Sequence, residues 1–328
     1  LDTKTFVTMA HLGARAFGQI SGEVVQTTAW ILNRVQIEHY QPVFHRLIDG
    51  NEEEKREALI KQENRFDNTQ QGDFKKIPGS PIAYWVDMKL RQVFERFKNV
   101  SDYATPRAGM ITGNNAKFVR LWHEIGARKL GLGYESKELA ADSGKKWFPY
   151  QKGGEFRKWY GNHDCVVNWE NDGYLLKNTK DDKGKVPAHA FNEKYIFKPN
   201  VNWSAVSSSF FSGRITPKGS LFDAGGSAAF PGDLESTYKL CAFLNSYVAR
   251  DALLAINPTL NFQAWNIGNL PVNIELLPQS VVSSTKILFN EAKRDWDLYE
   301  VSWDFNKHSL LGYKEFNLIK VSFAQPRK

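Results

Sequence analysis

Residues 145–162 read KKWFPYQKGGEFRKWYGN, with aromatic and basic side chains next to each other on both sides of a Gly-Gly pair. The rings in KWFPY and FRKWY predict two adjacent strands joined by a turn at the glycines, with the rings meeting as cross-strand pairs. We therefore expect Trp147, Phe148 and Phe156 to lie in a core. The lysine and arginine side chains of this stretch also raise the question of which partner they bind.

Composition limits what that partner can be. The chain has 328 residues, so two or three units with cores of their own are expected. Its net charge of +7 suits a polyanion such as nucleic acid, although many proteins with this charge bind none. The only cysteines, Cys165 and Cys241, exclude a disulfide framework or a thiolate zinc site and favour a reducing, cytoplasmic location.

The two ends of the sequence suggest a piece of a longer protein. No signal peptide and no apolar run long enough to span a bilayer is recognisable. Leu1 stands within what looks like a β-segment, so we expect an excised fragment. The stretch from Phe6 to Ile31 is rich in β-branched and aromatic residues and is broken by GQISGE, which predicts strands joined by a turn at the edge of a larger sheet.

Two helices are expected next. Residues 52–65 form a charged helix, and a second helix begins at Ser80, where Ser80 serves as the cap and Pro81 lies in the first turn. Together they predict a helical connector.

The rest of the chain has a mixed pattern. From about residue 106 to 273, short strands alternate with turn pairs, and a helix begins near Asp233 and must end before Pro258. After Pro278 a long amphipathic helix is predicted, with its apolar positions continuing to Trp303. The fold class is therefore expected to be mixed α/β (α+β).

Motifs of common enzyme classes are absent from the sequence. There is no GxxxxGK[ST] loop and no GxSxG elbow, and HEIGA at His123 lacks the second histidine of a zinc protease. SLFDAGGSAAFPG at 220–232 comes closest to a nucleotide-binding loop, but Pro231 and Gly232 disfavour a helix there, so a turn is expected. The scattered histidines predict no metal site.

Several phrases resemble a known family. They include FKKIPGSPIAYWV, KWFPYQKGGEFRKWYGNHDCVVNWENDG and FLNSYVARDALLAINPTLNFQAWNIGNLPV. In this order they are similar to the C-terminal half of the PglX family, the adenine-specific DNA methyltransferases of BREX phage-defence systems. That family is similar to single-chain type II restriction enzymes that fuse methyltransferase and specificity regions. The resemblance extends over nearly the whole chain.

The resemblance implies an N6-adenine methyltransferase that uses S-adenosylmethionine and acts on double-stranded DNA. Such enzymes bind the cofactor at a Gly-rich loop and hold the flipped adenine with an Asn-Pro-Pro-Tyr motif. Neither motif is present, since NPTL at Asn257 lacks the second proline and the aromatic residue. The fragment alone is therefore expected to bind no cofactor and to transfer no methyl group.

The resemblance also implies a division of the chain into four parts. These are the C-terminal edge of the methyltransferase domain (1–50), a helical connector (51–105), a target recognition domain (106–275) and a spacer helix region (276–328). NIGNLPV is similar to the exit of recognition domains in type I specificity subunits.

Three segments of the recognition region are candidates for contact with DNA. Basic residues beside the Gly-Gly turn would meet phosphates, and the amides of GMITGNNAKFVR would either read adenine edges or cap a helix. The third segment, SSSFFSGRITPKG, either contacts DNA through its serine and basic side chains or is a solvated loop. Trp159 and Tyr160 fit base stacking and a core about equally. The candidates are Asn114, Asn115, Lys117, Arg120, Lys145, Lys146, Lys152, Arg157, Lys158, Trp159, Tyr160, Ser208, Ser209, Arg214 and Lys218.

Two other functions remain open. The aromatic and basic surface could dock another subunit of the defence complex, in which case binding would depend weakly on salt, whereas DNA binding depends on it steeply. A nuclease is the other alternative, but its only support is Glu53-Glu54-Lys55 after Asp49, which a charged helix explains.

Overall fold

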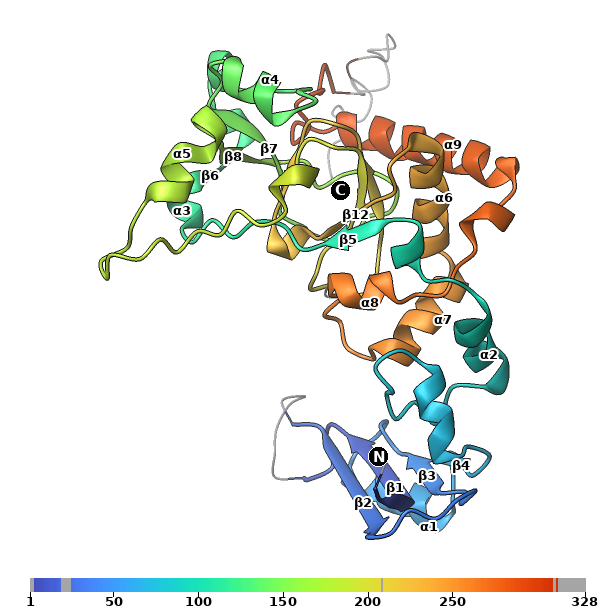
Figure 1. Cartoon of the computed structure of the whole chain (residues 1–328). Helices are drawn as coiled ribbons and strands as arrows, with labels where there is room; N and C mark the ends of the chain where they lie inside the picture. Colours follow the sequence, from blue (N-terminus) through green and yellow to red (C-terminus); the bar gives the residue numbers. More distant parts are fainter. Residues whose placement is uncertain (1–2, 19–24, 208, 309–310, 312–328) are drawn as a thin grey trace, which may run out of the picture. The chain divides into compact units, whose positions relative to one another are not determined.

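The computed structural model describes residues 3–18, 25–207, 209–308 and 311. It forms two compact units, Leu1–Phe97 and Lys98–Lys328 (Figure 1). Both units combine helices and strands, so the mixed α/β class is confirmed. Within the described residues, no helix is both long enough and apolar enough to cross a bilayer.

The first unit, blue to teal in Figure 1, is built on a sheet in the order β2-β1-β3-β4. β1 (Thr5–Gly13) pairs antiparallel with β2 (Thr27–Asn33) and parallel with β3 (Val43–Arg46), and β4 is Arg65–Phe66. The strands expected between Phe6 and Ile31 are thus confirmed, although most of the GQISGE turn lies outside the described residues. The helical elements of this unit are α1 (Glu52–Ile60), η1 (Gln71–Lys76) and α2 (Met88–Arg96).

The helix expected from Ser80 begins later than the sequence predicts. Ser80 has φ +49, in the left-handed region, and Tyr84 is buried with its ring stacked on Phe44 at a centroid distance of 4.6 Å. Because this packing holds residues 81–86 outside a helix, α2 starts only after Asp87, whose Oδ1 accepts a hydrogen bond from a backbone amide in the first turn. Tertiary packing here overrides a local capping signal. The charged helix, α1, also ends early, at Ile60.

The second unit contains two sheets, with strand orders β10-β9-β12-β5 and β11-β7-β8-β6. Its strands are β5 (Thr105–Arg107), β6 (Val119–Leu121), β7 (Trp147–Gln151), β8 (Cys165–Asn168), β9 (Asn200–Asn202), β10 (Arg214–Thr216), β11 (Leu221–Phe222) and β12 (Ala228–Phe230). Its α-helices are α3 (Asn115–Phe118), α4 (Lys137–Asp142), α5 (Glu170–Asn178), α6 (Leu234–Leu244), α7 (Tyr247–Ile256), α8 (Ala264–Gly268) and α9 (Gln279–Asp297). Its 3-10 helices are η2 (Val100–Asp102), η3 (Trp122–Glu124), η4 (Ala127–Lys129), η5 (Glu193–Tyr195), η6 (Ala224–Gly226) and η7 (Ile274–Leu276).

The core of the second unit lies against β7. Phe148 and Tyr150 point from one face of this strand into a buried cluster with Val167, Phe197 and Phe222. On another side of the unit, α6 and α9 lie side by side (Figure 1), in contact through aromatic rings.

The hairpin expected at the Gly-Gly pair is wrong. β7 is a strand, but its neighbours are β8 and β11 rather than the residues that follow the glycines. After Gln151 the chain crosses to the other sheet, where the Trp159 amide donates to the Gly213 carbonyl at 3.1 Å. Trp147 and Phe148 are buried as expected, but Phe156 is 43% exposed, because the strand that would have placed it in the core does not form.

Two expected helices differ in extent. The helix beginning at Asp233 is confirmed at its start, but it breaks into α6 and α7 where the Asn245 side chain bonds both the N–H and the C=O of Gly213. Ser246 then caps α7. The helix after Pro278 is confirmed as α9, which ends at Asp297, so Trp303 lies beyond it.

Candidate nucleic-acid interface

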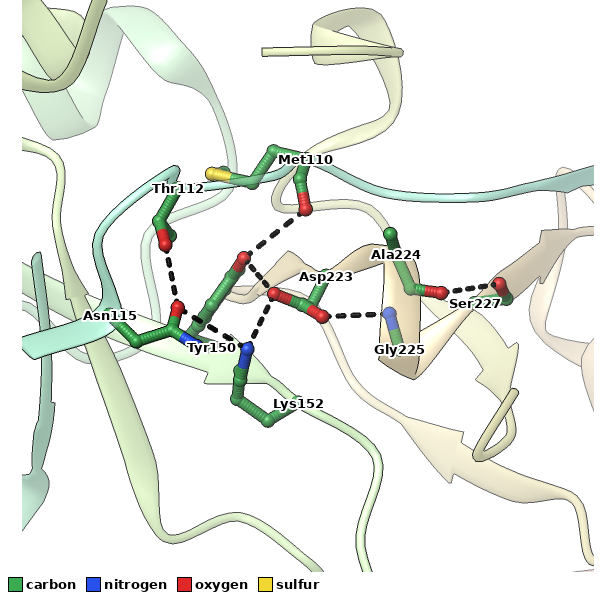
Figure 2. A network of polar contacts seen from close by, with 9 residues as sticks. All are labelled: Met110, Thr112, Asn115, Tyr150, Lys152, Asp223, Ala224, Gly225 and Ser227. Carbon is green, nitrogen blue, oxygen red and sulfur yellow. Dashed lines mark hydrogen bonds and ion pairs between the residues drawn. The ribbon is translucent and has the colours of Figure 1, made fainter. Parts of the chain in front are cut away.

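Asp223, directly after β11, is the centre of a polar network that joins separate segments of the second unit (Figure 2). Its Oδ2 accepts hydrogen bonds from the Tyr150 hydroxyl at 2.5 Å and from Lys152 Nζ at 2.9 Å. Its Oδ1 accepts from the Gly225 amide at 2.7 Å. Because Asp223 is only 8% exposed, these contacts hold the carboxylate, and with it the Lys152 ammonium, in one place.

Tyr150 is a fixed donor in this network. Burial, and after it the negative charge of Asp223, raises the pKa of Tyr150 far above the ordinary value of a tyrosine. The hydroxyl therefore keeps its proton, and the oxygen it meets must accept.

The network extends to the asparagines of GMITGNNAKFVR. Lys152 Nζ lies 3.4 Å from Asn115 Oδ1, which also accepts from Thr112 Oγ1 at 2.6 Å. Asn114 caps α3, since its Oδ1 accepts from the Lys117 amide at 3.0 Å. Of the two roles left open for this pair, the cap is confirmed for Asn114. The start of α3 offers little attraction for a phosphate, because α3 is one turn of four residues.

Two open hollows meet beside the network. One, of about 460 Å³, is lined in part by Asn115 and Arg120, and the other, of about 530 Å³, by Lys152 and Arg157. Cys165 lines both, so the hollows are neighbours on one face. The fold thus brings together candidates from two segments that the sequence could only treat separately.

The cationic candidates on the surface fall into two groups. Four of them form ion pairs: Lys146 with Glu170 at 3.2 Å, Lys152 with Asp223 at 2.9 Å, Arg157 with Asp295 at 3.4 Å, and Lys218 with Glu135. Within the described part of the chain, the other four donate only to hydroxyl or carbonyl oxygens: Lys117, Arg120, Lys145 and Lys158. Only the second group keeps a charge that no carboxylate offsets, and it is therefore better suited to phosphates.

Arg214 and Tyr160 cannot contact DNA in this structure, so both must leave the candidate set. Arg214 is fully buried, its Nε donates to Asn202 Oδ1 at 3.0 Å, and burial lowers its pKa to about 10. Tyr160 is 4% exposed, with its ring 4.7 Å from the ring of His163 and 5.4 Å from that of Phe289. Both residues lie where the loop after Gln151 packs along β10.

The remaining candidates lie apart from the Asp223 network. Trp159 is half-buried and is tied to β10 through its backbone. Ser209 is half-buried and donates its amide to Ser207 Oγ at 3.1 Å, whereas Ser208 lies outside the described residues. The described residues of the third segment, SSSFFSGRITPKG, therefore form no site together with the Asp223 network.

The Gly-Gly pair serves the protein's own packing. Gly153 has φ +87, and a Cβ there would lie 2.6 Å from the Gly225 carbonyl oxygen. Gly154 has φ +129, and its Cβ would lie 2.8 Å from Asn162 Nδ2. Both glycines therefore allow a close approach of other parts of this chain.

We expect Gly153→Ala to destabilise the second unit more than Gly144→Ala does. Both glycines have positive φ, but a Cβ at Gly144 would meet nothing within 4 Å. The difference between the two variants therefore isolates the clash with Gly225, which should cost about 1–3 kcal/mol. Urea unfolding measures it, and equal losses in the two variants would contradict the close packing at Gly153.

The SLFDAGG loop does not fit a methyl-donor cofactor. Its glycines lie in the short 3-10 helix η6, and β12 follows after Ser227, so no α-helix begins there. A Cβ at Gly226 would lie 2.2 Å from the Gln151 carbonyl oxygen, which shows that this glycine accommodates the chain's own backbone. The expected turn is confirmed.

The Cys165 thiol lines both hollows. Burial, and after it the charge of Asp164, raises the pKa of Cys165 to about 12, so its thiol is not an activated nucleophile. Among the residues that the structure describes, no three His, Cys, Asp or Glu side chains are grouped to hold a metal ion.

Three side chains of the network were not predicted as site residues from the sequence: Thr112, Tyr150 and Asp223. Asp223 stood in a motif examined for nucleotide binding, and Tyr150 in the opening stretch, but nothing in the sequence pairs them. The meeting of Tyr150 and Asp223 follows from strand β11 lying beside β7.

Comparison with known proteins gives this chain clear relatives. No family model matches it. It is 42% identical over 317 residues to the adenine-specific methyltransferase BrxX of Escherichia coli O9:H4 (strain HS), covering 96% of this chain and 25% of that protein. It is 39% identical over 316 residues to the adenine-specific methyltransferase PglX of Lacticaseibacillus casei (strain Zhang), covering 93% of this chain and 26% of that protein. The resemblance to PglX is confirmed.

The chain spans about a quarter of the length of PglX and BrxX, at 26% and 25%. Among solved structures, the type IIG restriction endonuclease BpuSI matches 86% of this chain and 38% of its own, at 12% identity and a TM-score of 0.34. That likeness is too weak to carry an argument, and the resemblance to PglX depends on the sequence relatives alone.

Proposed function

We propose that this chain provides DNA target recognition for an adenine-specific (N6) DNA methyltransferase of a BREX-type phage-defence system. One observation carries the proposal: Asn115 and Arg120, a cation without a carboxylate partner among the described residues, line one open hollow, and Lys152 holds the Asn115 amide beside it, in a chain whose relatives are named as adenine-specific methyltransferases. Amides and cations converging on one open face are the groups that read base edges and bind phosphates.

The four-part division of the chain belongs to the same proposal. Residues 106–275 would be the target recognition domain and 276–328 a spacer, with 1–50 the edge of the methyltransferase domain and 51–105 a connector. S-adenosylmethionine would serve the whole enzyme, and this chain alone would not methylate DNA. Its SLFDAGG loop, which packs on its own backbone, supports that expectation.

Methylome sequencing tests the proposal in cells. In a curated relative, the region matching residues 106–275 would be replaced by those residues, and the methylated motif would be compared before and after. A changed motif would support target recognition. Continued methylation of the original motif would contradict it.

In vitro, we expect Lys117→Gln/Arg120→Gln to weaken binding to duplex DNA. Neither cation has a carboxylate partner among the described residues, so each can release one counterion from a phosphate. The plot of log affinity against log salt should lose a slope of about one unit per contact, or about two units. Fluorescence anisotropy at several salt concentrations measures this slope.

Lys146→Gln/Lys218→Gln is the matched control, because it removes the same charge from residues that already have acidic partners. We expect it to change the slope less. If thermal melting shows that both variants are folded, equal slopes for wild type and the Lys117/Arg120 variant would mean that DNA does not contact these two residues.

Docking of another protein remains the second candidate, because a specific surface favours it. Four apolar or aromatic side chains on α7 and α8 are exposed: Tyr247 at 76%, Val248 at 57%, Leu254 at 46% and Trp265 at 53%. Apolar exposure of this kind marks protein contacts. Binding to DNA that does not change between low and physiological salt would favour docking over target recognition.

A further inference from the structure

The amide of Asn115 has a fixed orientation. Lys152 Nζ, 3.4 Å from the Asn115 side chain, carries only donors, so the amide oxygen and not the nitrogen must face it. Thr112 Oγ1 lies 2.6 Å from the same oxygen (Figure 2). An amide oxygen has two lone pairs, and these two donors occupy both.

Lys152 is itself held where this orientation needs it. Asp223 binds its ammonium at 2.9 Å, and Tyr150 and Gly225 fix the Asp223 carboxylate in turn. Asn115, by contrast, is exposed, and among the described residues its Nδ2 has no hydrogen-bond partner. The side chain therefore presents donors to the outside and no free acceptor.

Resting on the proposed function, we infer that Asn115 is a specificity-determining residue that reads guanine in the major groove. Guanine presents two adjacent acceptors there, N7 and O6, and so matches a group that only donates. The pairing of asparagine with adenine needs the amide oxygen to accept from N6, and in Asn115 that oxygen is already occupied. Cytosine presents only a donor, and thymine only one acceptor.

Guanine differs from both readings that the sequence left open for this amide, which were adenine edges and a helix cap. The difference comes from two residues distant in sequence from Asn115: Lys152, 37 positions away, and through it Asp223. A local motif cannot show which of its lone pairs are free.

Selection from a pool of random duplexes tests the inference with the 328-residue chain. Wild type should enrich duplexes with guanine at one position, Asn115→Ala should lose that preference, and Asn115→Asp should replace guanine by cytosine or adenine, because its outward oxygen accepts. Discrimination at that position should be about 5- to 150-fold. Asn178→Asp, also exposed, makes the same charge change elsewhere and should leave the preference intact.

A second measurement tests whether N7 of the guanine accepts the hydrogen bond from Asn115. In the selected duplex, 7-deazaguanine at this position removes the N7 acceptor, and it should weaken binding by wild type but not by Asn115→Ala. An unchanged motif in Asn115→Asp, or no preferred base in wild type, would overturn the role of Asn115 while DNA binding itself stands. No binding of wild type to any duplex would overturn the proposed function, and the inference with it.

Discussion

Asp223→Ala is expected to destabilise the second unit by about 3 kcal/mol. The substitution leaves the buried Tyr150 hydroxyl without its acceptor at 2.5 Å and the Lys152 ammonium without its counter-charge. The cost should lie at the lower end of the range for breaking a buried ion pair, because the Lys152 side chain is 30% exposed and can reach water. Urea unfolding followed by tryptophan fluorescence measures the loss.

Asp295→Ala is the control for this expectation. Asp295 pairs with Arg157 at 3.4 Å, but both side chains are well exposed, so its removal should cost less than about 1 kcal/mol. The double variant Asp223→Ala/Tyr150→Phe should cost less than the sum of the two single changes, since both remove the same hydrogen bond. Equal losses of unfolding free energy for Asp223→Ala and Asp295→Ala would show that the Asp223 network does not stabilise the second unit.

Elements whose signals are local could be predicted from the sequence. The starts of α6 and α9 follow from Asp233 as a cap and from Pro278, and each signal lies within one turn of its helix. The hairpin at the Gly-Gly pair failed because β7 takes as a neighbour β11, about 70 residues further along the chain. Alternation of side chains predicts a strand but does not name its partner.

The candidate site shows the same division. Residue types able to contact DNA could be found in the sequence, and Asn115 and Lys152 do meet. The sequence could not show which cations are neutralised, because the acidic partner lies far along the chain. Lys152 and Asp223 are 71 positions apart, and Arg157 and Asp295 are 138 positions apart. For the same reason Arg214 looked like a surface cation although it is fully buried.

The second unit should lose stability steeply as the pH falls below about 6.5, because of His163. Burial, with the nearby charges of Arg214 and Lys293, lowers the pKa of His163 from 6.5 to about 3. Between these values the unfolded chain binds a proton that the folded chain does not, so stability is fully present above pH 6.5 and falls by about 1.4 kcal/mol per pH unit below it. The loss reaches about 3 kcal/mol at pH 4.5.

The variant His163→Gln separates this contribution from all other titrations. Glutamine does not ionise, so the stability difference between wild type and variant should shrink steadily from pH 7 to pH 4.5, whatever the variant costs at neutral pH. His123→Gln, which removes an imidazole at an exposed position, provides the control for the substitution itself. Urea unfolding at four pH values gives the comparison. Parallel curves for wild type and His163→Gln would mean that the folded protein protonates His163 as readily as the unfolded chain does, which its burial at 4% exposure argues against.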